Sequence, residues 1–110
     1  MFSTKPNYYQ SCSPLGVKII ESVPYFCPFV YSNWECFDFI DFFKLDFYSG
    51  NAFKYLWRLG VKSEEIQLDL MKSLYYLKQY QFRTTYESLM LDCCNSLILA
   101  VEKELKQYEN

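Results

Sequence analysis

Apolar residues recur at helical spacing through the second half of the chain. Ile66, Leu70, Met71, Leu74 and Leu77 share one face of the segment that they span, whereas Asp69, Lys72 and Tyr76 share another. This period of three to four residues predicts an amphipathic helix. Ser63 is its predicted N-cap, because a serine followed by acidic residues suits the positive end of a helix.

A second amphipathic helix is predicted at the C-terminal end, over residues 84–108. Its apolar stripe consists of Met90, Cys94, Leu97, Val101 and Leu105. Charged residues 102–104 point to the opposite side. Either Thr84 or Thr85 is the predicted N-cap, because a side-chain hydroxyl can accept a hydrogen bond from a free amide of the first turn.

A third helix is predicted just before these two. Gly60 is its predicted C-terminal stop, since glycine adopts the left-handed conformation at low cost. Either Ser49 or Asn51 is the predicted N-cap, which puts Gly50 at the helix N-terminus. Together with the amphipathic helix that follows, it predicts a helical hairpin over residues 48–82.

The N-terminal half is rich in aromatic residues and has a weaker pattern. Residues 1–14 are predicted to form an extended arm, which ends where Pro14 suits the first turn of a short helix. Residues 24–33 contain two prolines and are predicted to be irregular or briefly extended. After Asn33, a predicted N-cap, three phenylalanines share one helical face: Phe39, Phe42 and Phe43. Their alternation also suits a strand, but the length and spacing of the stretch favour a helix.

These elements predict a mostly α-helical bundle of four or five helices, with an irregular, aromatic-rich N-terminal half. The 110 residues suit a single domain with a modest core, so residues 1–110 are taken as one unit. Hydrophobic residues make up 51% of the chain and aromatic residues 21%. Such a composition argues against disorder, which requires few aromatic residues and a large net charge.

Charge and composition exclude several classes of function. The formal net charge is −2, which disfavours a general nucleic-acid-binding surface. The chain contains no histidine, so a Ser–His–Asp triad and histidine-based zinc sites are excluded. Acid–base chemistry would fall to Asp, Glu, Lys, Tyr or Cys side chains, and no metal-ligand set is predicted.

Cysteine usage and the absence of long apolar runs bear on the compartment. The five cysteines include no C-x-x-C motif, and we interpret them as small buried thiols in a reducing cytosol. The first residues lack the apolar region of a signal peptide. No run approaches the roughly 20 apolar residues of a membrane span. A cytoplasmic protein that does not enter a membrane is therefore predicted.

Three cations line one edge of the helix that precedes Gly60. Lys54 and Arg58 are one turn apart, and Lys62 follows just past the helix end. Such a stripe is either ordinary solvated surface or half of a site for a phosphate. If the next helix returns antiparallel through the short turn, Lys72 joins the cluster. Arginine holds phosphate bidentately, and lysine supplies a compact charge.

Other residues of the hairpin complete a candidate nucleotide site. Free amides at a helix N-terminus favour anions, and Gly50 would let a ligand approach the backbone closely. Tyr55, Trp57 or Tyr76 would stack on a base. Asp69 would orient an attacking oxygen, chelate Mg²⁺ or hold the neighbouring arginine in place. No Walker A loop and no G-x-G-x-x-G motif accompany these residues.

Two segments of the hairpin, "FYSGNAFKYLWRLGVK" and "DLMKSLYYL", also carry a family pattern. Its matching residues are Gly50, Asn51, Lys54, Tyr55, Arg58, Gly60, Lys62, Asp69, Leu70, Lys72, Tyr76 and Leu77. They resemble the SaV-like family of small bacteriophage proteins, which includes an unconventional phage nucleotide kinase. Tyr8 stands where that family has an early histidine, and the segment between the first helix and Phe47 is longer than usual.

The resemblance implies a phage-type, nucleotide-handling protein in the host cytoplasm. The first hypothesis is a nucleoside monophosphate kinase without a P-loop, in which Asp69 and Arg58 are catalytic. ATP would be the donor, and dGMP or dTMP the acceptor. Asn51 would join the phosphate-binding residues.

Two alternatives remain open at this stage. The same cluster would also suit a protein that binds a nucleotide or a cyclic nucleotide signal without turnover, as a counter-defence factor would. The aromatic segment 25–48 would also suit a protein-interaction factor that forms a homo-oligomer or docks on a host protein, because Tyr, Trp and Phe are common interface anchors.

Overall fold

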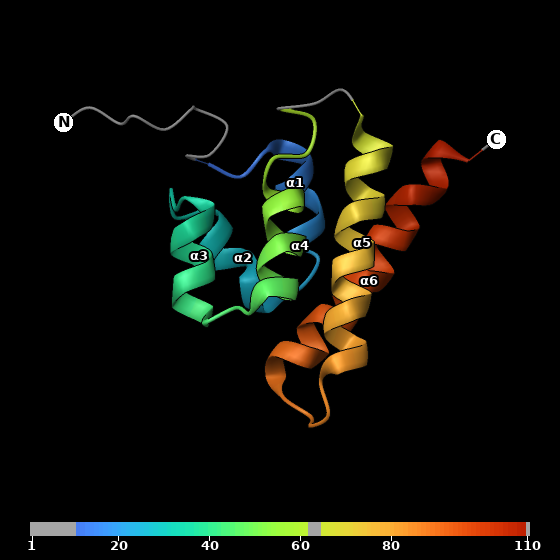
Figure 1. Cartoon of the computed structure of the whole chain (residues 1–110). Coiled ribbons are helices and arrows are strands. Elements are labelled where there is room, and N and C mark those ends of the chain that lie inside the picture. Colours follow the sequence, from blue (N-terminus) through green and yellow to red (C-terminus); the bar gives the residue numbers. More distant parts are fainter. Residues whose placement is uncertain (1–10, 62–64, 110) are drawn as a thin grey trace.

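The computed structural model of the chain describes residues 11–61 and 65–109. Within these ranges the chain forms six α-helices and no strand (Figure 1). The helices are α1 (Pro14–Ile20), α2 (Cys27–Val30), α3 (Cys36–Phe43), α4 (Phe47–Trp57), α5 (Ile66–Arg83) and α6 (Leu89–Leu105). Short 3-10 turns, Pro24–Phe26 and Lys106–Tyr108, adjoin α2 and α6. The prediction of a small, mostly α-helical domain is therefore confirmed.

Helix α1 begins where the sequence predicts. Ser13 caps it, because its hydroxyl accepts a hydrogen bond from the Gly16 amide at 3.0 Å. Pro14 occupies the first turn, where no amide is needed. Gly16 lies against α4, and a Cβ atom there would be 2.2 Å from the backbone oxygen of Leu56. Glycine therefore allows the two helices to approach this closely.

Residues 24–33 are helical for much of their length, contrary to the prediction of an irregular segment. The turn Pro24–Phe26 leads directly into α2, in which Pro28 occupies the first turn. Proline disrupts a helix only beyond that first turn, so both prolines are tolerated here. Phe26 is fully buried and Val30 is 8% exposed, so apolar burial holds this segment against the core.

Helix α3 confirms that the aromatic stretch is helical but not where the helix starts. Asn33, the predicted N-cap, instead has a left-handed backbone with a φ of 61°. Glu35 is the N-cap, and its amide donates to the Asp38 carboxylate at 2.9 Å. This pairing is half of a capping box, and it places the N-cap two residues after Asn33.

Helix α4 starts earlier than predicted. Its N-cap is Asp46, whose carboxylate accepts from the Ser49 amide at 2.8 Å. In return, the Ser49 hydroxyl accepts from the Asp46 amide at 3.1 Å. Because this capping box begins the helix at Phe47, Gly50 lies inside it. The predicted N-caps Ser49 and Asn51, and the predicted place of Gly50 at the helix N-terminus, are therefore wrong.

The turn after α4 contains the predicted glycine stop. Gly60 has a φ of 75°, the left-handed conformation that favours glycine. Helix α4 itself ends at Trp57, slightly before the stop. Helix α5 begins at Ile66, and its predicted cap Ser63 lies outside the described residues.

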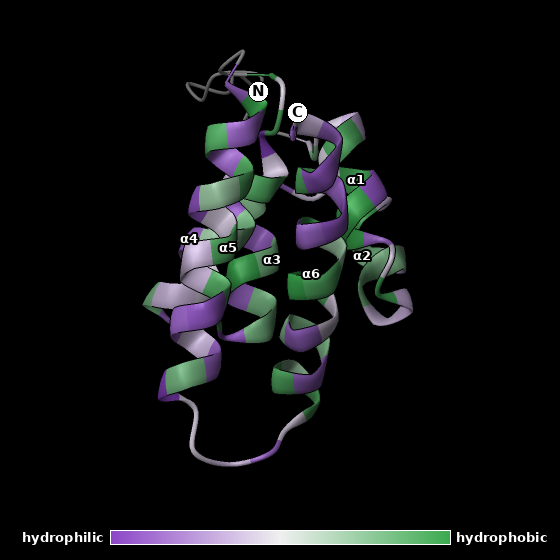
Figure 2. Cartoon of the chain, turned by 90° about the vertical axis from the view of Figure 1, so that its right-hand side faces the viewer, coloured by the Kyte–Doolittle hydropathy of each residue, from purple (hydrophilic) through white to green (hydrophobic). Residues whose placement is uncertain are grey.

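Helices α5 and α6 form an antiparallel hairpin, and α5 also packs extensively against α4 (Figures 1 and 2). Ser88, rather than Thr84 or Thr85, caps α6, because its hydroxyl accepts from the Leu91 amide at 3.1 Å. The Thr84 hydroxyl instead donates to the Tyr80 carbonyl at 2.6 Å, at the end of α5.

The predicted apolar stripes largely coincide with buried positions. On these two helices, the fully buried members are Leu70, Leu77, Cys94, Leu97 and Val101. Met71 was predicted to face the core but is 52% exposed. Asp69 was predicted on the polar face but is only 7% exposed. Both differences arise because α4 and α6 cover two sides of α5, and a single stripe does not show which sides those are.

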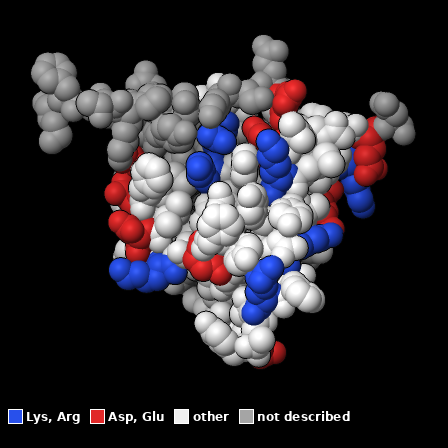
Figure 3. Space-filling view, viewed as in Figure 1, with Lys and Arg blue, Asp and Glu red and all other residues white. Residues whose placement is uncertain are grey.

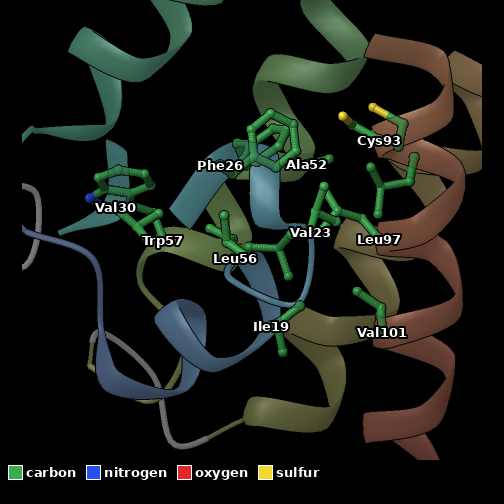
Figure 4. Close-up of a cluster of buried hydrophobic side chains, with 14 of the residues drawn as sticks. Ile19, Val23, Phe26, Val30, Ala52, Leu56, Trp57, Cys93, Leu97 and Val101 are labelled. Carbon is green, nitrogen blue, oxygen red and sulfur yellow. The ribbon is translucent and has the colours of Figure 1, made fainter. Parts of the chain in front are cut away.

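The core lies where α1, α4 and α6 meet. Figure 4 shows its side chains pointing toward one another, among them Ile19, Val23, Ala52, Leu56, Leu97 and Val101. A cluster of rings extends this core toward α3. The Phe39 ring lies 4.7 Å from that of Phe53 and 5.5 Å from that of Trp57, measured between centroids. Phe26 is 5.4 Å from Phe39. These contacts attach the aromatic N-terminal half to the hairpin.

In the described part of the chain, no helix combines the length and apolar character needed to cross a membrane.

Candidate functional site

Two of the predicted cations converge from different helices on one aromatic ring. The guanidinium carbon of Arg58, at the end of α4, lies 5.2 Å from the centre of the Tyr55 ring. The ammonium nitrogen of Lys72, on α5, lies 5.5 Å from the same centre. These are cation–π distances. The antiparallel return of α5 thus brings these three residues together.

Tyr76 adds a second ring to this group. It lies nearly parallel to Tyr55, with 6.0 Å between ring centroids and 13° between ring planes. Both rings are half-buried, so both retain an exposed part. Lys72 is exposed and forms no ion pair with any residue in the described ranges. Figure 3 shows Lys and Arg side chains over the face that α4 and α5 form.

Lys54 lies one turn before Arg58 on the same edge of α4 and is partly buried. Burial raises the pKa of the Cys36 thiol on α3 to about 12. The positive charges of Lys54 and Arg58 act in the opposite direction on this pKa, and their effect is smaller. Arg58 therefore acts on both the Tyr55 ring and the Cys36 thiol, and Lys54 acts on the same thiol. At neutral pH this thiol is protonated, so it is not a thiolate nucleophile.

Gly50 and Asn51 are not placed as an anion site. Gly50 is buried, and a Cβ atom there would lie 3.9 Å from the Ile40 side chain. The Asn51 side-chain amide donates to the Phe47 carbonyl at 2.7 Å, within α4. At the true start of α4, the Asp46 carboxylate accepts from the Ser49 amide and the Ser49 hydroxyl accepts from the Asp46 amide.

Asp69 is positioned one turn before Lys72 on α5, and at 7% exposure it is one of few buried charged side chains. A carboxylate buried to this degree does not offer an open coordination site to a surface ligand. Within the described residues, no group of Asp, Glu and Cys side chains is arranged to hold a metal ion. The remaining predicted cation, Lys62, lies outside the described residues, as does Tyr8.

Sequence reasoning missed a hollow at the opposite end of the α4–α5 face. It has a volume of about 420 Å³ and is lined by residues from the end of α3, the α3–α4 turn, α4, α5, the α5–α6 loop and the start of α6. Arg83 and Lys44 supply its cations, and Thr84, Thr85 and Ser88 supply hydroxyls. No single segment carries these residues, which explains why no motif indicated them. The sequence feature that could have indicated this hollow is the run Arg83-Thr84-Thr85, an arginine followed by two threonines.

The aromatic segment 25–48 divides between core and surface. Phe26 and Phe39 are fully buried, whereas Phe37 and Phe42 are 50% and 57% exposed. Much of this segment therefore has a structural role, because its buried rings attach α3 to α4. An oligomer or a host-protein contact through the exposed rings stays a prediction.

The five cysteines are free thiols. Cys36, Cys93 and Cys94 are buried, as predicted for small apolar side chains, while Cys12 and Cys27 are partly exposed. Burial raises the pKa of Cys12 and Cys94 to about 12 as well.

The strongest functional feature of the described residues is a cluster on one face of α4 and α5, formed by Arg58, Lys72, Tyr55 and Tyr76. Comparison with protein-family models, with curated proteins and with solved structures finds no match to the chain.

Proposed function

We propose that this protein binds a nucleotide, or another phosphate-bearing small molecule, on the face that α4 and α5 form. The observation that carries the proposal is the position of Arg58 and Lys72 against the one Tyr55 ring. Two positive charges near the same ring repel each other, and an anion bound between them relieves this repulsion. A phosphate suits this role, because its oxygens accept hydrogen bonds from guanidinium and ammonium groups at once.

The two tyrosine rings supply the apolar part of the proposed site. Tyr55 and Tyr76 are already nearly parallel and half-buried, so little side-chain freedom is lost when a ligand binds. Nucleobases stack on aromatic side chains irrespective of base identity, because every base has a π-face. Phe47, which is 67% exposed and in edge contact with Tyr76, extends the surface available to a base.

Phosphoryl transfer is the more specific proposal, and the family resemblance supports it. Such a reaction needs positioning and electrostatic stabilisation more than covalent chemistry by the protein. Arg58 and Lys72 would offset charge on the transferred group from ATP. Because Asp69 is buried, direct contact of its carboxylate with the substrate is not part of this proposal.

Thermal-shift and calorimetric titrations with ATP, dGMP, dTMP and inorganic phosphate test binding. A ligand at about 100 times its Kd is expected to add about 2.7 kcal/mol of stability. The double variant Arg58→Glu, Lys72→Glu is expected to lose binding. Lys103→Glu reverses one exposed cation on α6, which is half the charge change of the double variant, and is expected to retain binding. Equal binding by the double variant and the wild type would show the proposal to be wrong.

Turnover separates the kinase from the non-catalytic alternative. ATP is incubated with dGMP or dTMP at high protein concentration, and the nucleotides are separated by chromatography. Nucleoside diphosphate formation that the double variant abolishes would support the kinase. Binding without product would instead support a protein that sequesters a nucleotide or a cyclic nucleotide signal.

A further inference from the structure

The ring contacts at Tyr55 continue along the seam between α4 and α5. Tyr76 contacts Phe47 edge-on at 6.1 Å, and Phe47 contacts Tyr48 at 5.3 Å. The guanidinium carbon of Arg83 lies 4.7 Å from the centre of the Tyr48 ring. We call the four rings Tyr55, Tyr76, Phe47 and Tyr48 the aromatic strip. It has cations at both ends, with Arg83 opposite the Tyr55 end.

The two cationic ends lie on the same side of α5. Lys72, Tyr76 and Arg83 are separated by four and seven residues, a spacing that keeps them on one helical face. At 1.5 Å of rise per residue, Lys72 and Arg83 are about 16 Å apart along the helix axis. A mononucleotide carries its phosphates on one side of one sugar, so it does not reach both ends with charge.

The Arg83 end opens into the hollow of about 420 Å³ described above. This volume falls within the range of about 300–1,000 Å³ that is typical of small-molecule sites. Lys44 lines the hollow with Arg83, and Thr85 and Ser88 add hydroxyl groups, whereas the Thr84 hydroxyl already donates to the Tyr80 carbonyl. The second cationic end therefore has room for a nucleoside, together with donors for a phosphate.

The charge on this face differs from the formal net charge of the whole chain, which is −2. Figure 3 shows several Lys and Arg side chains over α4 and α5, with some acidic side chains among them, and further acidic side chains along the edge where α3 lies. Asp46 also lines the hollow, where its Oδ1 accepts from the Ser49 amide and hydroxyl, each at 2.8 Å. Its single negative charge is outnumbered there by the two cations Arg83 and Lys44. Local potential, rather than net charge, decides whether a face attracts an anion.

We infer that this face binds a short single strand of nucleic acid, an inference that rests on the proposed function and extends its ligand beyond one nucleotide. Bases stack on the exposed Phe47 ring and pack against the other rings of the aromatic strip, while phosphates contact Arg58 and Lys72 at one end and Arg83 and Lys44 at the other. Phosphates of one strand recur about every 3.4 Å when stacked, so a span of about 16 Å suits about five nucleotides. Rings combined with cations along one groove are a general means of holding single strands.

Fluorescence anisotropy with labelled pentathymidylate, and with the matching uridine pentamer, tests this inference and distinguishes DNA from RNA. Competition with dTMP and UMP gives the mononucleotide affinities. Stacking contributes about 1–3 kcal/mol per base, so at least one pentamer is expected to bind about tenfold or more tightly than its mononucleotide. Arg83→Gln is expected to weaken pentamer binding by about tenfold. The same variant is expected to reduce the slope of the logarithm of the pentamer binding constant against the logarithm of salt concentration by about 0.7. Its expected effect on dTMP binding is small.

Lys103→Glu serves as the charge-change control on α6 and is expected to leave pentamer binding unchanged. Should Arg83→Gln fail to fold by circular dichroism, Lys44→Gln on the other wall of the hollow provides the same test. Pentamers that bind no more tightly than dTMP and UMP would overturn the inference, as would pentamer binding that is insensitive to both variants. If ATP, dGMP and dTMP all fail to bind while a pentamer binds through Arg83, the strand inference holds and the mononucleotide proposal fails.

Discussion

Gly16 and Gly50 show how differently two helical glycines can behave in one small protein. A Cβ atom on Gly16 would lie 2.2 Å from the Leu56 carbonyl oxygen, which is backbone and cannot swing away. A Cβ atom on Gly50 would lie 3.9 Å from the Ile40 side chain, an ordinary van der Waals contact. The sequence predicts that a ligand approaches the backbone closely at Gly50. In the structure, it is at Gly16 that a close approach requires glycine, and the approaching group is the backbone of α4.

This difference predicts opposite effects of alanine. Gly16→Ala is expected to reduce the free energy of unfolding by about 1–3 kcal/mol, because α1 must move away from α4. Gly50→Ala is expected to be neutral or to stabilise by up to about 1 kcal/mol, because alanine favours a helix interior. Urea unfolding of both variants measures the two effects. A Gly16→Ala variant as stable as the wild type would contradict the tight packing of α1.

At the scale of elements, caps set where each helix begins and hence which residues it presents. The reciprocal bonds between Asp46 and Ser49 start α4 at Phe47, so that Phe47 itself becomes an exposed helical ring beside Tyr76. A later start at Asn51 would leave Phe47 in the preceding loop. The cap therefore contributes to the aromatic strip as well as to stability.

Asp46→Ala is expected to lower the free energy of unfolding by about 1 kcal/mol, since it removes the side chain that accepts from the first turn of α4. Asp41→Ala is the matched control, because it removes an exposed carboxylate from the last turn of α3. Its expected effect is within about 0.5 kcal/mol. Chemical denaturation of both variants makes the comparison. Equal stability of the two variants would argue against the cap.

For the molecule as a whole, the absence of histidine and the burial of thiols determine how stability depends on pH. No side chain has an ordinary pKa between those of carboxylates and thiols, so stability should change little between about pH 6 and pH 8. Burial raises the pKa values of Cys12, Cys36 and Cys94 to about 12, from 9.0 for a free thiol. The native state therefore keeps protons that the unfolded state loses above about pH 9.

The sign of this linkage predicts a loss of stability at alkaline pH. Each raised thiol contributes its full stabilisation below the unfolded pKa of 9.0 and loses it progressively as pH rises toward about 12. By pH 10 the expected loss is about 1 kcal/mol per thiol. Urea unfolding at pH 8 and pH 10 measures the change. The triple variant Cys12→Ala, Cys36→Ala, Cys94→Ala is expected to show a smaller difference between these pH values, and an unchanged difference would contradict the prediction.

The sequence by itself determined the α-helical class, the order of the longer helices and most of their buried positions. These properties are local, because a helix is read from apolar spacing within a few turns, and Leu77 and Val101 were recognised as core in this way. Helix starts were less predictable. At Asn33, Asn51 and Thr84 a plausible capping residue was present, but a neighbouring residue formed the better set of hydrogen bonds.

Only the tertiary structure decided which residues meet across helices. Sequence spacing proposed that α5 returns beside α4, but the contact of Arg58 and Lys72 with one Tyr55 ring depends on how the two helices are rotated and packed. The burial of Asp69 and the hollow between Arg83 and Lys44 depend on α3, α4 and α6 together. Such features need contacts between residues far apart in the chain, and periodicity within one helix carries no information about them.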